Sequence, residues 1–114
     1  MDRLDAHRAA VRQLMERQAE LLRQAKGGGD VESALVIDQD QQRFVLWELG
    51  WDGGRRVNHV YLHVQPKGGK IWVEEDWTEE GIANELVRAG VPKEDIVLGF
   101  QPQERRHLTE FAVV

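Results

Sequence analysis

The hydrophobic positions of the first 25 residues recur at intervals of three and four, which predicts an amphipathic helix over about residues 3–25. Good helix formers fill the other positions, and the glycines at 27–29 end the pattern. We expect the apolar stripe to pack on the protein's own sheet. A coiled coil is the alternative, because Leu4, Val11, Gln18 and Ala25 are spaced by seven. The stripe consists of Leu4, Val11, Leu14, Met15, Leu21, Leu22 and Ala25.

After the glycines the hydrophobic period changes to two, which is typical of β-strands. Gly53-Gly54 and Gly68-Gly69 provide tight turns, because glycine accepts the positive φ that hairpins require. Three hairpins in series indicate an antiparallel meander. The predicted strands are 31–37, 43–51, 55–65 and 70–76.

The second of these strands is apolar on both faces, so we expect it to be central in the sheet. Phe44 and Leu46 lie on one face of the strand. Trp47 and Trp51 share the other face with Val45 and Leu49, and we expect the two tryptophans to lie in the core.

The last third of the chain predicts a second helix over about residues 79–89, with Thr78 as its N-terminal cap. Glu79 and Glu80 then meet the positive end of the helix dipole, and Gly90 ends the helix. One short turn is expected at 93–95, and the apolar run 96–100 is either a strand or a buried connector. The apolar end, residues 109–114, is expected to be held in the sheet or across a subunit interface.

These elements predict an α+β fold, an antiparallel meander of about four or five strands packed against the two helices. The chain has 114 residues, of which 41% are hydrophobic and 31% charged, which indicates one domain over 1–114. A domain of this size buries enough surface to fold without metal ions or disulfides, and the chain has no cysteine. We therefore expect no cofactor.

The sequence has no apolar run of the roughly 20 residues that a membrane span needs, and its start resembles no signal peptide. We expect a cytoplasmic protein that does not bind membranes. The formal net charge is −5, with +2 in residues 1–26 and −7 in the remainder. Non-specific DNA binding relies on a basic surface, so we expect any contact with DNA to be made through a partner.

His59 and His63 have the spacing of a metal-binding pair on a helix, but they fall on a predicted strand. There they would lie on one face about 13 Å apart, too far for one ion. Metal binding or mimicry of DNA phosphates is the functional interpretation of the acidic run Glu74, Glu75, Asp76, Glu79 and Glu80; solvated carboxylates are the simpler one. Because no catalytic motif is present, we expect the protein not to be an enzyme.

Several residues are candidates for binding a partner protein. Trp72 alternates with Ile71 and Val73, so it points outward if those two point inward, and Trp77 lies beside a turn. Two adjacent basic pairs provide cationic groups for a phosphate or an acidic surface. The candidates are Trp72, Trp77, Arg55, Arg56, Arg105, Arg106 and, in the apolar tail, Phe111.

From residue 49 onward the sequence closely resembles the XisI-like family, named for the fdxN element excision controlling factors. The blocks Gly90-Val91-Pro92-Lys93-Glu94-Asp95-Ile96-Val97-Leu98-Gly99-Phe100 and Thr109-Glu110-Phe111-Ala112-Val113 are the longest, and Gly69-Lys70-Ile71-Trp72-Val73 is a third. The resemblance implies an α+β accessory protein of programmed DNA excision, in which a separate recombinase cuts and rejoins DNA. It also implies a nuclease-related XisH-like partner, and it transfers no catalytic residue.

The leading hypothesis is thus a non-catalytic subunit that binds an XisH-like protein and modulates its action on DNA. Direct DNA binding by a homo-oligomer, through the two arginine pairs, is the alternative. The apolar tail and the four tryptophans separately predict that a second copy covers one face of the meander or its edge, as a homodimer, since two-fold closure is the commonest form of self-association.

Overall fold

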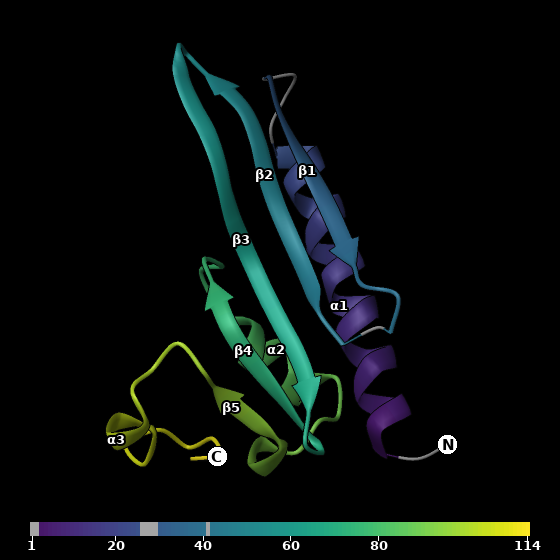
Figure 1. The fold of residues 1–114 in the computed structure, drawn as a ribbon, viewed down its shortest axis with the longest axis vertical. Coiled ribbons are helices and arrows are strands. Elements are labelled where there is room, and N and C mark those ends of the chain that lie inside the picture. Colours follow the sequence, from purple (N-terminus) through teal and green to yellow (C-terminus); the bar gives the residue numbers. More distant parts are fainter. Residues whose placement is uncertain (1–2, 26–29, 41) are drawn as a thin grey trace.

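The computed structural model describes residues 3–25, 30–40 and 42–114 (Figure 1). Glycines 27–29 and Gln41, which the sequence assigns to a helix stop and a turn, lie outside these residues. The described elements form a five-stranded sheet, ordered β1-β2-β3-β4-β5, with helices around it. They are α1 (Arg3–Ala25), β1 (Asp30–Ile37), β2 (Phe44–Asp52), β3 (Arg55–Lys67), β4 (Lys70–Asp76), α2 (Ile82–Arg88), the 3-10 helix η1 (Lys93–Asp95), β5 (Ile96–Leu98) and α3 (Gln103–Arg106).

The first four strands form the predicted antiparallel meander, and β2 has a neighbour on both sides, as expected of a central strand. β5 is the strand of the two alternatives expected for 96–100, but it pairs in parallel with β4, so the fifth strand does not extend the antiparallel meander and the sheet is mixed. The reason is the connection between the two strands: the chain returns through α2 behind the sheet, and such a crossover brings the next strand back in the same direction.

Helix α1 packs along one face of the sheet, which confirms the first interpretation of its apolar stripe. Val11, Met15 and Ala19 are fully buried there. Leu21 is 45% exposed, whereas Gln18 turns inward and donates a hydrogen bond of 2.7 Å to Glu85 of α2. The stripe that meets the sheet is therefore rotated slightly from the one that hydrophobicity alone indicates.

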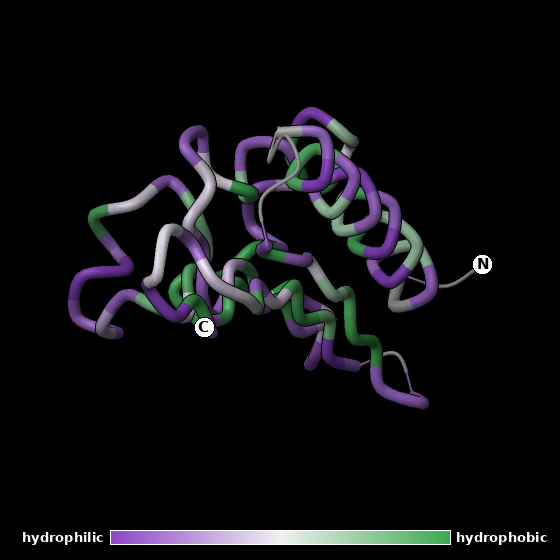
Figure 2. Tube along the Cα trace, turned by 90° about the horizontal axis from the view of Figure 1, so that it is seen from above, coloured by the Kyte–Doolittle hydropathy of each residue, from purple (hydrophilic) through white to green (hydrophobic). Residues whose placement is uncertain are grey.

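The hydrophobic core lies between the sheet and the two helices, and Figure 2 shows α1 along one side of the sheet only. Phe44 and Leu46 of β2 point into this core. Trp47 and Trp51 are 39% and 52% exposed, so the prediction that they lie in the core was wrong. Both faces of β2 are apolar, and the helices cover the Phe44 face. The other core residues of the sheet and α2 are Leu62, Val64, Ile71, Val73, Ile82, Ala83, Leu86 and Ile96.

Helix α2 begins at Ile82, three residues later than predicted, because Gly81 adopts a φ of 89° that no helix contains. Its first N–H groups are satisfied from upstream: Asp76 accepts a bond of 2.7 Å from the Ile82 N–H, and the Thr78 hydroxyl accepts one of 3.1 Å from the Gly81 N–H. The carboxylate at the positive end of the helix dipole is therefore that of Asp76, rather than those of Glu79 and Glu80 as expected.

The C-terminus of α2 is as predicted, with Gly90 at a φ of 103°. The Gly90 N–H donates to the Val87 carbonyl and the Val91 N–H to the Leu86 carbonyl, each over 3.0 Å. This is the Schellman pattern, which satisfies carbonyls that the helix leaves open.

The apolar C-terminal segment is held by its own sheet. The Ala112 N–H donates to the Ile96 carbonyl over 2.8 Å, and Ala112 forms a parallel bridge with Val97. Phe111 packs against the core. Of the two expectations for this segment, the structure shows attachment to the sheet.

Candidate functional site

Trp77 is 63% exposed, and its indole is fixed at the point where β4 ends. The ring N–H donates 2.8 Å to Glu75, and the ring meets His59 edge-on with centroids 6.2 Å apart. Its backbone N–H bonds the Tyr61 carbonyl over 3.1 Å, which continues the pairing with β3 beyond β4. An exposed tryptophan whose orientation is fixed in advance is typical of an anchor in a protein interface.

A hollow of about 350 Å³ lies between α1, β3 and the start of α2, and it adjoins Trp77 through Tyr61, which accepts the Trp77 backbone N–H, and through the next residue, Thr78. Its charged lining is mostly acidic, with three glutamates against one arginine. Burial raises the pKa of the Tyr61 phenol, and the nearby carboxylates Glu48, Asp76 and Glu79 raise it further, so this corner has a negative potential. The lining residues are Arg17, Gln18, Leu21, Tyr61, Thr78, Glu79, Glu80 and Glu85. We call Trp77 and this hollow the Trp77 corner.

Trp72 points away from the core, as predicted, because Ile71 and Val73 on either side of it are buried. Two cations contact the Trp72 ring: the Lys67 ammonium lies 4.4 Å and the Arg106 guanidinium 5.2 Å from the ring centroid. Arg106 also donates bonds of 3.1 Å to the carbonyls of Gln101 and Val113. Arg106 thus fastens the C-terminal segment across Trp72.

The two arginine pairs do not form one surface. Arg55 and Arg56 follow the tip of the β2–β3 hairpin, and Arg105 and Arg106 lie in α3, at the opposite end of the molecule (Figure 1). The Arg56 guanidinium lies 5.4 Å from the centroid of the Trp51 ring. The structure therefore brings together neither a four-arginine phosphate site nor the full set of predicted partner-binding residues.

The histidines lie apart from one another. His59 pairs with Glu48, at 3.0 Å, whereas His63 lies opposite Val45, and a bulge between them places the two on opposite faces of the sheet rather than on one. His7, for which the sequence shows no local partner, is buried 3.3 Å from Asp95. Within the described ranges, no group of three or more acidic or histidine side chains is arranged to hold a metal ion.

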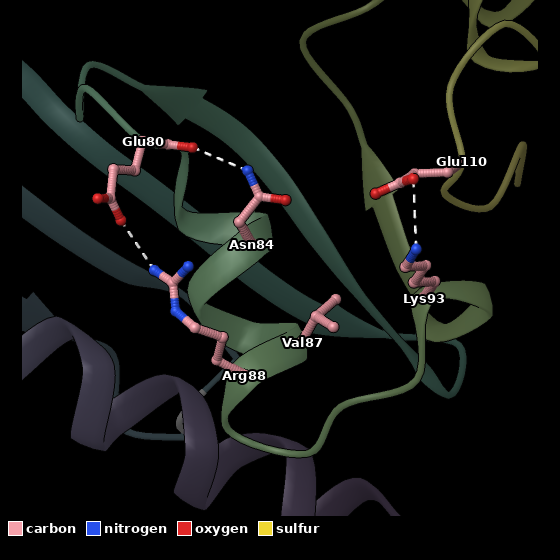
Figure 3. A pocket seen from close by; sticks show the side chains of 6 residues that line it. All are labelled: Glu80, Asn84, Val87, Arg88, Lys93 and Glu110. Atoms are coloured by element: carbon pink, nitrogen blue, oxygen red, sulfur yellow. Dashed lines mark hydrogen bonds and ion pairs between the residues drawn. The ribbon is translucent and has the colours of Figure 1, made fainter.

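A hollow of about 460 Å³ on the outer side of α2 is lined by paired charges (Figure 3). Arg88 contacts Glu80 at 2.8 Å, and Lys93 contacts Glu110 at 3.2 Å, so the second pair joins η1 to the C-terminal segment. Asn84 donates to the Glu80 carbonyl. Because these polar and charged groups already bond to one another, they are poor candidates for binding a ligand in the hollow.

The predicted homodimer requires an uncovered face or edge of the meander, and the side of the sheet away from the helices carries an exposed apolar face. Its hollow, about 330 Å³, is lined by Ala34, Val36, Trp47, Leu49 and Asn58. The signal was the apolar character of both faces of residues 44–51, but the sequence does not show which face the helices cover.

Known proteins share the sequence pattern and the architecture of this chain. Residues 1–113 match the protein family described as XisI protein. The chain belongs to the XisI family. A XisI-like protein from Anabaena variabilis has 33% identity and a TM-score of 0.87, with 97% of this chain and 99% of that chain covered.

The fdxN element excision controlling factor XisI from Anabaena variabilis has 36% identity and a TM-score of 0.84, with 99% of this chain and 100% of that chain covered. The mixed sheet and its helices are therefore the XisI fold. No curated protein matches this chain. Among the described helices, none has both the length and the hydrophobicity needed to cross a membrane.

Proposed function

We propose that this XisI-family protein is a non-catalytic controlling factor for the excision of a DNA element, and that it acts by binding a nuclease-related XisH-like partner. Full-length similarity to an fdxN element excision controlling factor supports the process. The Trp77 corner is the observation that carries the mode of action, because it combines a fixed, exposed anchor with an acidic hollow.

The charge of the corner favours a basic partner surface. A protein that acts on DNA carries cationic groups against the phosphates, and an acidic surface that covers those groups competes with DNA for them. The net charge of −5 on the whole chain acts in the same direction. The proposed effect on the partner is thus restraint of its action on DNA.

Binding of the purified XisH-like protein, measured by calorimetry, tests this surface. Trp77→Ala should weaken binding at least about 30-fold, the effect of losing an interface hot spot. Glu79→Lys should slow association and reduce its dependence on salt. Phe100→Ala is the matched control, since it removes another exposed aromatic side chain, outside both the Trp77 corner and the exposed face of β1–β3, and should leave the affinity unchanged.

Equal affinities for Trp77→Ala and the wild type would reject the Trp77 corner as the binding surface. Absence of binding at micromolar concentrations by the wild type, with both proteins folded, would reject the partner itself.

We also propose that contact with DNA is indirect, because the arginine pairs lie at opposite ends of the molecule and Arg106 is bonded within its own chain. The isolated protein should not shift labelled duplex at about 50 mM salt, where phosphate contacts are strong. A salt-sensitive shift that is lost in Arg55→Ala/Arg56→Ala would instead establish direct DNA binding.

A further inference from the structure

The face of β1–β3 that points away from α1 is an apolar surface with a charged margin on each side. Three of its large hydrophobic side chains are exposed: Val36 at 53%, Trp51 at 52% and Trp47 at 39%. Figure 2 shows the helix on the other side of these strands. The C-terminal segment covers the β4–β5 part of this side, where Arg106 lies over Trp72. An uncovered apolar face of this kind marks an interaction site.

The chemistry of this face suits another protein surface. No charged side chain lines its hollow of about 330 Å³, and the single polar residue there, Asn58, accepts the Trp47 indole N–H over 2.6 Å. The indole donor is therefore already used within the chain. A phosphate or a polar small molecule finds no cation in the hollow, whereas an apolar side chain can fill it.

The strand register places charges of opposite sign on the two sides of the apolar strip. Asp30 and Glu32 of β1 pair with Trp51 and Leu49 of β2, so their side chains share the exposed face with those residues. On the other side, Arg56 of β3 pairs with Trp51 and lies against its ring. At its Trp51 end the face is thus acidic on β1, apolar on β2 and basic on β3, while Ala34, Val36 and Val60 continue the apolar strip further along.

This order is self-complementary under one rotation. A two-fold axis along β2 lays β1 of one copy over β3 of the other and β2 over β2. Asp30 then faces the partner copy's basic margin, and the contact occurs twice because a two-fold interface is isologous. A two-fold axis across the strands would instead lay β1 over β1, so that neither Asp30 nor Glu32 meets the basic margin on β3.

We infer that a second copy of this chain covers the exposed face of β1–β3, about a two-fold axis along β2. The strands of the two copies then run in the same general direction, as in aligned packing of one sheet on another. The apolar row Val45, Trp47, Leu49 and Trp51 forms the centre of the interface, and the Asp30 and Arg56 margins pair at its sides. This inference is independent of the XisH-like partner, whose proposed site is the Trp77 corner.

Light scattering on a size-exclusion column tests the inference with the full chain of 13.1 kDa. The wild type should elute with twice that mass, and Val36→Lys, which places a charge on an already exposed position, should elute as a monomer. Leu108→Lys, at an exposed position outside the sheet, is the control and should remain a dimer. Circular dichroism and thermal melting establish that each variant is folded.

A charge exchange tests the axis. Arg56→Asp should weaken the dimer at least about tenfold, since both charge contacts become repulsive, and adding Asp30→Arg should restore it. A monomeric wild type would overturn the inference. A dimer that is unaffected by Val36→Lys, or one that the double exchange does not restore, would also overturn it.

Discussion

His7 and Asp95 show what a single buried contact contributes to this fold. The imidazole of His7 in α1 lies 3.3 Å from the Asp95 carboxylate at the end of η1, and both side chains are almost fully buried. The two residues are 88 positions apart, so no local pattern predicts the pair. Residue types and periodicity locate helices and strands, but a long-range contact between polar groups depends on the packing of the whole chain.

We predict that His7→Ala lowers the free energy of unfolding by about 1–3 kcal/mol, because it removes a buried hydrogen-bond partner of Asp95. Urea denaturation measures this. Arg12→Ala is the control: its pair with Glu16 spans 4.0 Å on the exposed side of the same helix, and its loss should change stability by less than about 0.5 kcal/mol. Equal effects of the two substitutions would contradict the role given to His7.

His63 makes stability depend on pH. Burial lowers the pKa of its imidazole below the ordinary value of 6.5, and Arg43 lowers it further, while Glu74 and Glu75 act in the opposite direction. Its Nε2 is buried with no hydrogen-bond partner among the described residues. The unfolded chain therefore binds a proton more readily than the folded one, and stability falls as the pH decreases below 6.5.

We predict that the stability of His63→Gln falls less than that of the wild type as the pH decreases. The urea midpoint of the wild type should fall between about pH 7.5 and about pH 5.5, and that of His63→Gln should fall less, because the other titrating groups are common to both. Identical declines would show that His63 takes no part.

At the scale of elements, the sequence predicts the helix over 3–25 and all four antiparallel strands to within about two residues at each end. It does not predict the direction of β5, because a run of three strand residues has no periodicity that distinguishes parallel from antiparallel pairing. It also misplaces the start of α2, since Thr78 resembles a cap while Asp76, from the preceding strand, bonds the first helical N–H.

Gly50 controls the close approach of β1 to β2. Its φ is 149°, and a Cβ at this position would lie 1.9 Å from the Asp30 carbonyl oxygen. Gly50→Ala should therefore destabilise the protein by at least about 2 kcal/mol and separate the start of β1 from the hairpin. Amide hydrogen exchange measures this: protection should be lost in β1 and β2 and retained in the other strands.

Gly53→Asn provides the control for that substitution. Gly53 has a φ of 57° with no atom within 4 Å of an added Cβ, and asparagine accepts this conformation. It should change stability by less than about 1 kcal/mol. An equally mild effect of Gly50→Ala would contradict the packing described for β1.

At the scale of the molecule, the sequence predicts that tryptophans gather on the meander, but not that the Trp77 corner and the exposed apolar face lie on different sides of it. Trp77 and Trp72 are placed as expected, whereas Trp47 and Trp51 are exposed because α1 and α2 cover the Phe44 face of β2. The helices leave the opposite face of β1–β3 open. Helix α1 and the start of α2 instead line the hollow of the Trp77 corner. One surface is thus available for a second copy and another for a different protein.

Binding of an XisH-like protein is the proposed action of this XisI-family protein. The most direct measurement is the mass, by light scattering on a size-exclusion column, of the two proteins expressed together, beside that of each alone. One mixed complex of defined mass is expected, which Trp77→Ala dissociates and Phe100→Ala does not. Two separate peaks, each with the mass of one protein alone, would contradict it.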